Sequence, residues 1–525
     1  MTPECFAIVN AGLLDGSGAP LRRADAVVEA GRVRTVASAG ELNLTGVPKF
    51  DAGGLFLAPG FIDAHSHSDA TLMLYPESES RITQGFTTEV VGQCGDADFI
   101  CADPARRERL EAENGAEVVW HDLASYMAEL ARRRPAVNVA ALAGHGAIRE
   151  EVLGMSNRAP SPGELRRMTE LLDTALRQGA AGMSSGLVYL PGRYAETPEL
   201  LALAARLRGT GKLYATHLRS EGAEILPALR EAAEIARAAD RRLVVSHLKT
   251  MGRENWPKIN GILAEIDAMS RSGLAVTSDR YPYLHAATGL RNVLPEPYVS
   301  IADLPSFLAE PEHRREVAAA LEHAETQRKL PAEWEGILFA GAQVKPEHLA
   351  LRGLSLREIA RRFGTTPAEA CVELLGSEPN PRTQLQCMCE ENLDRILSLD
   401  FVAAGSDSSG VPLDPSGPLT HPRAFGTAAR FFRRVSRLVS PAEAVRRMTS
   451  LPAQVHGLAG RGLIREGYAA DLVLFDPEEF DAPADYRDPR RPAVGVRMVW
   501  VNGVVAFDAK NPKRRGRAGV FLPVY

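Results

Sequence analysis

Histidine, cysteine and aspartate side chains recur where short apolar stretches of this sequence end. The stretches include PGFIDAHSHSD, TTEVVGQCG, ATHLR, VSHLK and AAGSDSS. The residues concerned are His65, His67, Cys94, His217, His247 and Asp407. Imidazole, thiolate and carboxylate groups are the ligands that zinc selects in proteins. Taken alone, His65 and His67 could be two exposed loop histidines, but in this company they indicate a metal site.

Strands that alternate with helices would bring these residues together. Eight apolar stretches end in polar residues and are each followed by a helical stretch: FLAPGFIDAHSH, TTEVVGQCG, NVAALAGHG, GMSSGL, LYATHLRS, LVVSHLK, TQLQCMC and VAAGSDSS. This alternation over roughly 400 residues predicts a (β/α)8 barrel, a TIM-like α/β fold whose reactive groups lie at the C-terminal ends of the strands. Ligands gathered from separate strands are typical of a catalytic zinc site with an open coordination position.

Segments rich in strand and turn signals flank the predicted barrel. Residues 1–57 and 460–525 predict one small β-sandwich assembled from both ends of the chain, which leaves residues 58–459 for the barrel. Between about residues 281 and 340 the alternation gives way to prolines and a charged helical tract. This span is longer than a routine loop and predicts a lid-like insertion after Tyr281.

The composition excludes several classes of protein. The 525 residues carry 61 Lys+Arg against 66 Asp+Glu, a net charge of −5, without the basic domain that a nucleic-acid binder needs. No apolar stretch approaches the ~18–20 residues that span a bilayer, and no signal peptide is recognisable. The six cysteines are irregularly spaced, unlike a disulfide framework. We expect a cytoplasmic protein with no nucleic-acid or membrane partner, whose basic cluster at 513–517 is a solvated tail.

The sequence resembles the amidohydrolase superfamily and, within it, the N-acyl-D-amino-acid deacylase (D-aminoacylase) family. The resemblance rests on PGFIDAHSHSD, ITQGFTTEVVGQCG, GHGAIR, GMSSGLVYLPGRYA, YATHLRSEG, VSHLKTMGRENW, DRYPY, GSDSSG with HPRAFGT, and MTSLPAQVHGLAGRGLIREGYAADLVLFD. These stretches cover nearly the whole chain in order. The resemblance implies a metal-dependent barrel of the amidohydrolase type with an appended β-sandwich.

The resemblance also assigns roles to the metal-binding residues. It places one tight zinc ion on Cys94, His217 and His247, and a second, weaker ion on His65 and His67 with Cys94 as a bridge. Asp407 would border the metals and act as the general acid and base. Many amidohydrolases bridge two metals with a carboxylated lysine on the fourth strand, but this strand, AAGMSSGL, has no lysine.

The substrate contacts are predicted in part by the same resemblance. Lys249 lies two residues beyond His247, on the same side of the strand, and the family uses this lysine and Tyr281 to bind the substrate carboxylate. A serine that often follows in the family is Ala287 here. We expect the neighbouring Thr288 to substitute for it, or Arg291 to bind the α-carboxylate or an acidic side chain of the substrate. The alternative is that Lys249 is a charged surface residue that does not contact the substrate.

Other residues of the same loops have weaker predicted roles. His145 closes the third strand and either lines the site or makes a structural hydrogen bond. Tyr189 and the nearby Arg193 shape the fourth loop and are candidates for substrate contact. Cys387 and Cys389 share one face of the stretch TQLQCMC and are expected to be small buried residues rather than metal ligands.

The predicted function is zinc-dependent hydrolysis of the amide bond of N-acyl-D-amino acids, which are small-molecule substrates. The preference for D-amino acids comes from the resemblance alone. Alternatives are a deacylase for L-amino acids or a secondary metabolite, a cyclic-amide hydrolase of the hydantoinase or dihydroorotase kind, and a metal-free scaffold protein. The missing fourth-strand lysine disfavours the cyclic-amide hydrolase, and the complete ligand set disfavours the scaffold. The oligomeric state is left open.

Overall fold

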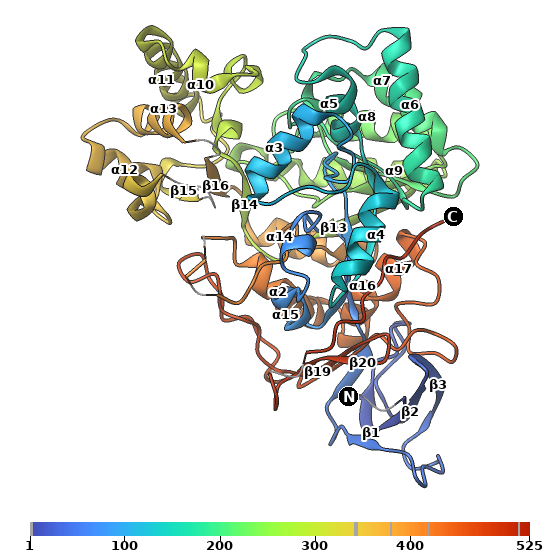
Figure 1. The fold of residues 1–525 in the computed structure, drawn as a ribbon. Helices are drawn as coiled ribbons and strands as arrows, with labels where there is room; N and C mark the ends of the chain where they lie inside the picture. The colour runs from blue at the N-terminus through green and yellow to red at the C-terminus, as the bar shows by residue number, and fades with distance from the viewer. Residues whose placement is uncertain (1–3, 341–344, 379–380, 415, 418, 513–514) are drawn as a thin grey trace.

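The computed structural model describes residues 4–340, 345–378, 381–414, 416–417, 419–512 and 515–525. A parallel β-barrel surrounded by helices occupies its centre (Figure 1). The barrel strands are β6 (Phe61–Asp63), β7 (Phe86–Val91), β8 (Asn138–Ala141) with its continuation β9 (Ala143–Gly144), β10 (Gly182–Gly186), β11 (Leu213–His217), β12 (Arg242–Val245), β13 (Ala275–Arg280) and β17 (Val402–Ala404). The predicted (β/α)8 fold is confirmed.

Hydrogen bonds close these strands into a ring. They form one run in the order β6-β7-β8 and another in the order β9-β10-β11-β12-β13-β17. The first and last strands meet where the Ala64 N–H donates to the Ala404 carbonyl at 3.1 Å and the Asp407 N–H donates to the His65 carbonyl at 2.8 Å. The closure of the barrel therefore places the residues that follow β6 directly beside those that follow β17.

Amphipathic helices pack around the ring. In α6 (Pro162–Arg177), Ser161 and Glu164 form a capping box, Pro162 begins the helix, and the buried face carries Met168 and Leu172. The helices outside the insertion are α1 (Thr71–Leu74), α2 (Glu79–Ile82), α3 (Pro104–Asn114), α4 (Leu123–Arg133), α5 (His145–Leu153), α6 (Pro162–Arg177), α7 (Thr197–Ala204), α8 (Ile225–Ala238), α9 (Ile259–Arg271), α14 (Glu390–Leu397), α15 (Arg423–Leu438), α16 (Pro441–Met448) and α17 (Ser450–Val455). Among the described residues, no helix combines the length and the apolar character needed to cross a membrane.

The seventh barrel strand differs from the one predicted. The stretch TQLQCMC lies in β16 (Arg382–Gln386) and just beyond it, and β16 belongs to a separate antiparallel sheet. The barrel strand at this position is β13, which pairs in parallel with β12 and β17. Its sequence AVTSDR is mostly polar, so its apolar signal is weak. Strand β16, with the sequence RTQLQ, has a buried centre between exposed ends, and the buried Cys387 and Met388 that follow it add the apolar signal of a barrel strand.

The insertion is longer than predicted. Its three-stranded sheet has the order β14 (His285–Gly289), β16, β15 (Ile337–Ala340), so the inserted segment extends past residue 340 to the end of β16. Its helices are α10 (Leu304–Phe307), α11 (Pro311–Thr326), α12 (Leu356–Phe363) and α13 (Pro367–Ser377). They project from the barrel as a separate lobe (Figure 1). Trp334 and Phe339 are buried in a core of its own.

Strands from both ends of the chain form one eight-stranded sheet. They are β1 (Cys5–Leu13), β2 (Arg22–Glu29), β3 (Arg32–Ser38), β4 (Lys49–Asp51), β5 (Phe56–Pro59), β18 (Leu472–Phe475), β19 (Val496–Val501) and β20 (Val504–Asp508). Strand β18 pairs with β5, which joins the two ends. Phe6 and Trp500 stack with ring centroids 6.0 Å apart inside the shared core. The blue and red strands of this β-sandwich lie together below the barrel in Figure 1.

The last residues of the chain return to the barrel. The Leu522 N–H donates to the Val139 carbonyl at 2.7 Å, and the Val524 N–H donates to the Gly179 carbonyl at 2.9 Å. Lys212, which directly precedes β11, donates from its buried ammonium to the Val524 carbonyl. Side chains of this tail pack on apolar residues from several barrel strands. Residues 513–514 of the basic cluster, for which a solvated tail is predicted, lie outside the described residues, whereas Arg515 and Arg517 form ion pairs with Glu79 and Glu77.

Candidate metal centre and substrate cavity

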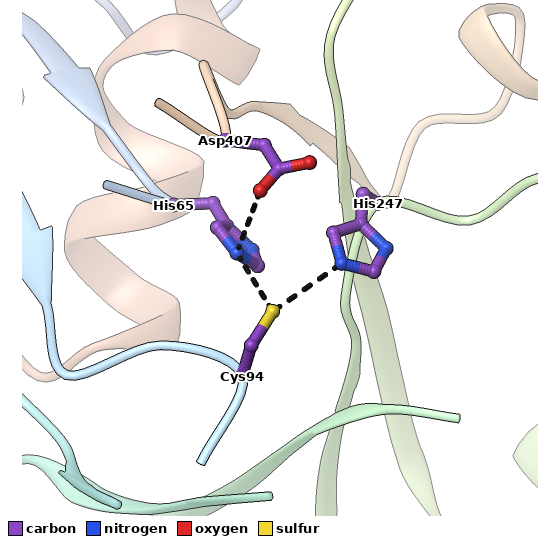
Figure 2. A group of neighbouring side chains, drawn as sticks. All are labelled: His65, Cys94, His247 and Asp407. Atoms are coloured by element: carbon purple, nitrogen blue, oxygen red, sulfur yellow. Dashed lines mark hydrogen bonds and ion pairs between the residues drawn. The ribbon is translucent and has the colours of Figure 1, made fainter. Parts of the chain in front are cut away.

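The Cys94 thiol lies at the centre of a group of imidazoles. Its Sγ is 3.4 Å from His65 Nε2, 3.4 Å from His247 Nε2 and 3.8 Å from His217 Nδ1. These residues follow or end β6, β7, β11 and β12, and all of them are buried. Figure 2 shows His65, Cys94, His247 and Asp407 pointing toward one another from different elements. The structure therefore brings together candidate metal ligands that are up to more than a hundred residues apart in the sequence.

Asp407 completes this group from the eighth strand. Its Oδ1 lies 3.1 Å from His67 Nε2 and 3.6 Å from His65 Nε2. Its other oxygen, Oδ2, accepts a hydrogen bond of 2.7 Å from the Arg423 guanidinium. The metal-donor atoms of His65, Cys94, His247 and Asp407 all lie within 4.8 Å of one another. One carboxylate oxygen therefore faces the metal ligands while the other is held by arginine.

The backbone at this site is held in an unusual conformation. Cys94, His247 and Asp407 have positive φ angles of 54°, 37° and 50°, a region that residues other than glycine rarely occupy. Behind Cys94 lies Gly186, where an added Cβ would come within 1.9 Å of the Cys94 carbonyl oxygen. Such strain persists where the surrounding fold over-determines it, and it is typical of functional sites.

Two buried carboxylates orient the imidazoles. Asp279 Oδ1 lies 3.1 Å from His65 Nδ1 and accepts a hydrogen bond of 2.9 Å from the His247 N–H. Glu221 lies 3.0 Å from His247 Nδ1 and 3.4 Å from His217 Nε2. Carboxylates in this position fix the ring orientation of metal-binding histidines. Neither carboxylate is predicted from the sequence, because the polar stretch of β13 does not resemble a strand and Glu221 lies four residues beyond His217.

Asp279→Asn is expected to weaken zinc binding by about 10- to 100-fold, the usual loss when such a carboxylate is removed. The physical reason is that the imidazole of His65 and the backbone of His247 both lose their charged anchor. Zinc competition with a chelator would measure the affinity. Asp173→Asn, at an exposed ion pair with Arg206, is the matched control. Equal zinc affinity in the Asp279 variant and the wild type would contradict the orienting role.

The electrostatics of the site suit a metal cation. Burial alone would raise the pKa of the Cys94 thiol, but the imidazoles of His65 and His247 lower it well below its ordinary value. Burial likewise opposes ionisation of Asp407, yet Arg423 and His247 keep its pKa well below the usual range. A thiolate, a carboxylate and several imidazoles with fixed orientations match the donor preferences of zinc. The donor set therefore fits the predicted metal.

A cavity lies beside the metal ligands, under the insertion. His217, His247 and Asp407 contribute to one end of it. Lys249 and Tyr281 also line it, as do Tyr189 and Thr288. The Tyr281 ring is flanked by the guanidinium groups of Arg280 and Arg423, at 4.2 and 4.6 Å from its centroid. The structure thus brings most of the predicted substrate-contact residues to one place.

Two predicted contacts do not reach this cavity. Arg291 donates to the Ile301 carbonyl at 2.6 Å, within the insertion. The buried His145 bonds Glu199 at 2.8 Å, which agrees with its structural alternative. Arg291 lies in the short helix η4 (Leu290–Val293), where its guanidinium is directed to the Ile301 carbonyl. The spacing of residues along the loop could not predict this direction.

The cysteine pair beyond β16 is separate from the metal ligands. Cys387 is buried, and burial raises the pKa of its thiol to about 11. Cys389 is half-buried at the beginning of α14. Neither belongs to a group of potential metal ligands found among the described residues.

Comparison with known proteins agrees with this geometry. The model of the amidohydrolase family matches residues 49–333 and 350–507. An N-acyl-D-aspartate deacylase from Alcaligenes xylosoxydans xylosoxydans is 35% identical over 99% of this chain and 95% of its own. An N-acyl-D-glutamate deacylase from the same organism is 33% identical over 98% of this chain and 96% of its own.

Solved structures of N-acyl-D-amino-acid deacylases are similar to this chain over its whole length. The N-acyl-D-glutamate deacylase of Bordetella bronchiseptica, in complex with zinc and a phosphonate mimic of the tetrahedral intermediate, superposes with a TM-score of 0.82 at 32% identity over 99% of both chains. A D-aminoacylase structure has a TM-score of 0.82 at 30% identity over the full length of both chains. The L-hydantoinase of Arthrobacter aurescens, at 16% identity and a TM-score of 0.56, shares the fold alone. The predicted resemblance is confirmed, and the chain belongs to the N-acyl-D-amino-acid deacylase group of the amidohydrolase family.

Proposed function

We propose that this protein is a zinc-dependent hydrolase that cleaves the amide bond of N-acyl-D-amino acids, releasing a carboxylate and a free D-amino acid. The observation that carries the proposal is the position of Asp407. Its carboxylate faces the metal-donor group around Cys94 and also lines the cavity that could hold a substrate. Acid–base group, metal ligands and binding space therefore meet at the C-terminal end of the barrel, where such folds perform catalysis.

Metal binding is divided between two sets of residues. Cys94, His217 and His247 would hold the tight zinc ion, while His65 and His67 would hold a second, weaker one beside the same thiolate. Bound zinc supplies Lewis acidity, which polarises the amide carbonyl and lowers the pKa of water. Asp279 and Glu221 keep the imidazoles in place during the reaction.

Asp407 transfers the proton. Because Arg423 holds Oδ2, Oδ1 is the oxygen that faces the metal ligands and takes a proton from the attacking water. The same oxygen then delivers the proton to the amide nitrogen as the C–N bond breaks. Water is the nucleophile, so the reaction requires no covalent bond to the protein.

Lys249 and Tyr281 would bind the α-carboxylate of the substrate. The Tyr281 hydroxyl is buried in the cavity wall without a hydrogen-bond partner in the structure. The Lys249 ammonium forms an ion pair with Glu221 and lies 2.8 Å from His247 Nδ1. These two groups therefore offer a hydroxyl donor and a cation close to the metal ligands.

Lys249→Met is expected to raise KM for N-acyl amino acids by about 10- to 100-fold, the cost of losing a hydrogen bond to a charged group. The effect on kcat should be smaller, because the carboxylate is bound in both the ground state and the transition state. Steady-state kinetics would measure both constants, with Lys329→Met on the exposed surface of the insertion as the control. A fall in kcat with KM unchanged would assign Lys249 to the metal ligands instead of the substrate.

The decisive experiment is a hydrolysis assay on the zinc-loaded protein. N-acetyl-D-methionine and N-acetyl-L-methionine should be compared, with hydantoin and dihydrouracil as cyclic-amide controls. We expect release of free D-methionine and little turnover of the others. The cyclic amides are disfavoured because β10, with the sequence GMSSG, contains no lysine to bridge two metals. Turnover of a cyclic amide alone, or of no N-acyl-D-amino acid in a panel that also includes N-acetyl-D-aspartate and N-acetyl-D-glutamate, would refute the proposed function.

A further inference from the structure

A fully buried arginine, Arg81 in α2, belongs to an ion cluster beside the closure of the barrel. Its Nε is 2.9 Å from Glu89 Oε1 and 3.5 Å from Asp63 Oδ2, and all three side chains are 0% exposed. Buried ion clusters add little net stability, because the loss of hydration offsets much of the attraction between the charges. The contacts of this Arg81 cluster with the backbone are therefore its more informative feature.

The remaining donors of the Arg81 guanidinium bind the chain around Asp407. One terminal nitrogen donates to the Ser408 carbonyl and, at 3.1 Å, to the Ser408 hydroxyl. The other donates to the Ala424 carbonyl at 3.1 Å. Ser408 directly follows Asp407, and Ala424 directly follows Arg423, which bonds the Asp407 carboxylate. The guanidinium therefore fixes the backbone on both sides of that contact.

The two carboxylates of the cluster bind the segments that follow β6 and β17. Glu89 Oε2 accepts a hydrogen bond of 2.8 Å from the hydroxyl of Ser66, which directly follows His65. Asp63 Oδ1 accepts from the N–H groups of Ser406 at 2.7 Å and His65 at 3.3 Å. The cluster therefore holds both segments at once.

The same two segments also pair with each other. Ser66 and Ser408 form a parallel bridge. The His67 N–H donates to the Ser408 carbonyl at 3.0 Å, so this carbonyl accepts from both His67 and Arg81. The pairing brings His67 Nε2 to 3.1 Å from Asp407 Oδ1. The distance between these two side chains thus depends on a carbonyl that Arg81 holds.

We infer that Arg81 is a positioning residue that keeps His67 and Asp407 in register across the closure of the barrel. It acts through the Ser408 carbonyl. The inference rests on the proposed function, which assigns the weaker zinc ion to His65 and His67 and the proton transfer to Asp407. It goes beyond that proposal by naming a residue outside the metal ligands that sets their alignment.

The two proposed zinc ions should depend on Arg81 to different extents. The weaker ion would bind His67, whose backbone shares the Ser408 carbonyl with Arg81. The residues proposed for the tight ion lie outside the segments that the cluster holds; they are Cys94, His217 and His247. Loss of the Arg81 contacts should therefore weaken the binding of the second ion selectively.

Arg81→Lys separates the position of the guanidinium from its charge. Lysine keeps the positive charge beside the carboxylates, but its single ammonium cannot reproduce the planar fork that reaches Glu89, Ser408 and Ala424 together. Zinc should be titrated, without substrate, into protein that retains its tight ion after dialysis. We expect the affinity for the second ion to fall by at least about tenfold and that for the tight ion to change by less than about threefold.

Steady-state kinetics with only the tight ion bound provide a second readout. A shifted Asp407 would transfer protons poorly, so kcat should fall by about 10- to 100-fold. KM should change by less than about threefold, because the proposed carboxylate-binding groups, Lys249 and Tyr281, lie outside the held segments. If the wild type takes up a single zinc ion, this separation of kcat from KM decides the inference.

Arg447→Lys is the matched control. Arg447 is also buried, with its Nε 2.8 Å from Glu443 Oε1, and it donates to the Leu397 carbonyl at 2.7 Å. Its replacement should leave both zinc affinities and kcat unchanged. If Arg81→Lys kept the second-ion affinity and the kcat of the wild type, the inference would be overturned, and an equal loss of both ions would overturn it as well. A wild type without hydrolytic activity would refute the proposed function, whereas the zinc titration needs no substrate and would still decide the inference.

Ser66→Ala provides the test if Arg81→Lys does not fold. It removes only the hydroxyl that links the Glu89 carboxylate to the Ser408 carbonyl, at 2.8 and 3.3 Å. Loss of a hydrogen bond to a charged group should weaken the second ion by about 3- to 10-fold and leave the tight ion in place. An unchanged second-ion affinity in this variant would contradict the role of the cluster.

Discussion

Asp407→Asn should lower kcat by about three orders of magnitude or more while the protein keeps its tightly bound zinc. A positioned acid–base group contributes about 10²–10⁴-fold to a rate, and here one carboxylate serves both proton transfers. The amide of asparagine has nearly the same size but cannot accept a proton at the oxygen that faces His65 and His67. The set proposed for the tight zinc ion, Cys94, His217 and His247, does not include the mutated residue.

The measurement combines kcat with the zinc content of the purified variant. Asp414→Asn, at an exposed turn seven residues further along the chain, is the control for a nearby change of charge. A kcat within a few-fold of the wild type would remove Asp407 from the reaction. Loss of zinc together with activity would show that Asp407 acts mainly as a metal ligand.

Cys94→Ala should abolish tight zinc binding and, with it, activity. The thiolate is the anionic ligand shared by the imidazoles of His65, His217 and His247, and its Sγ lies within 3.8 Å of all three. Removing it leaves neutral ligands around a cation, so we expect kcat/KM to fall by at least about 1,000-fold at equal zinc concentration.

Metal analysis after dialysis would test this expectation directly. Cys389→Ala removes a half-buried thiol outside the metal group and should retain zinc and activity. If Cys94→Ala retained stoichiometric zinc after dialysis and remained active, the thiolate would not be the ligand that anchors the metal. Such a result would also mean that Cys94 does not replace the carboxylated lysine that bridges the two metals in many other amidohydrolases.

The sequence located the candidate metal ligands because each one closes an apolar stretch that becomes a barrel strand, and the structure brings their side chains together. It did not predict the carboxylates behind them. Asp279 lies in β13, whose sequence AVTSDR has too few apolar residues to read as a buried strand. The structure reveals it because hydrogen bonds with β12 and β17, which are far away in the sequence, hold that strand in the barrel.

The insertion shows a second limit of sequence analysis. Its sheet pairs β14 with β16 across almost a hundred residues, so no local pattern marks where the segment ends. Arg291 illustrates the consequence for the site. Its neighbours in sequence, Ala287 and Thr288, line the cavity, but the arginine itself turns to the carbonyl of Ile301. Side-chain direction within an irregular segment depends on tertiary contacts that the sequence does not display.

The docking of residues 522–524 on the barrel has a consequence for how the protein would unfold. The carbonyl of Val524 binds Lys212, and its N–H bonds a residue that precedes β10, while the preceding Leu522 hydrogen-bonds β8. One short segment therefore links three neighbouring parts of the barrel wall and packs on apolar residues from several barrel strands. Loosening this segment would expose those apolar residues to water, so its release and the opening of the barrel should occur together rather than as separate events.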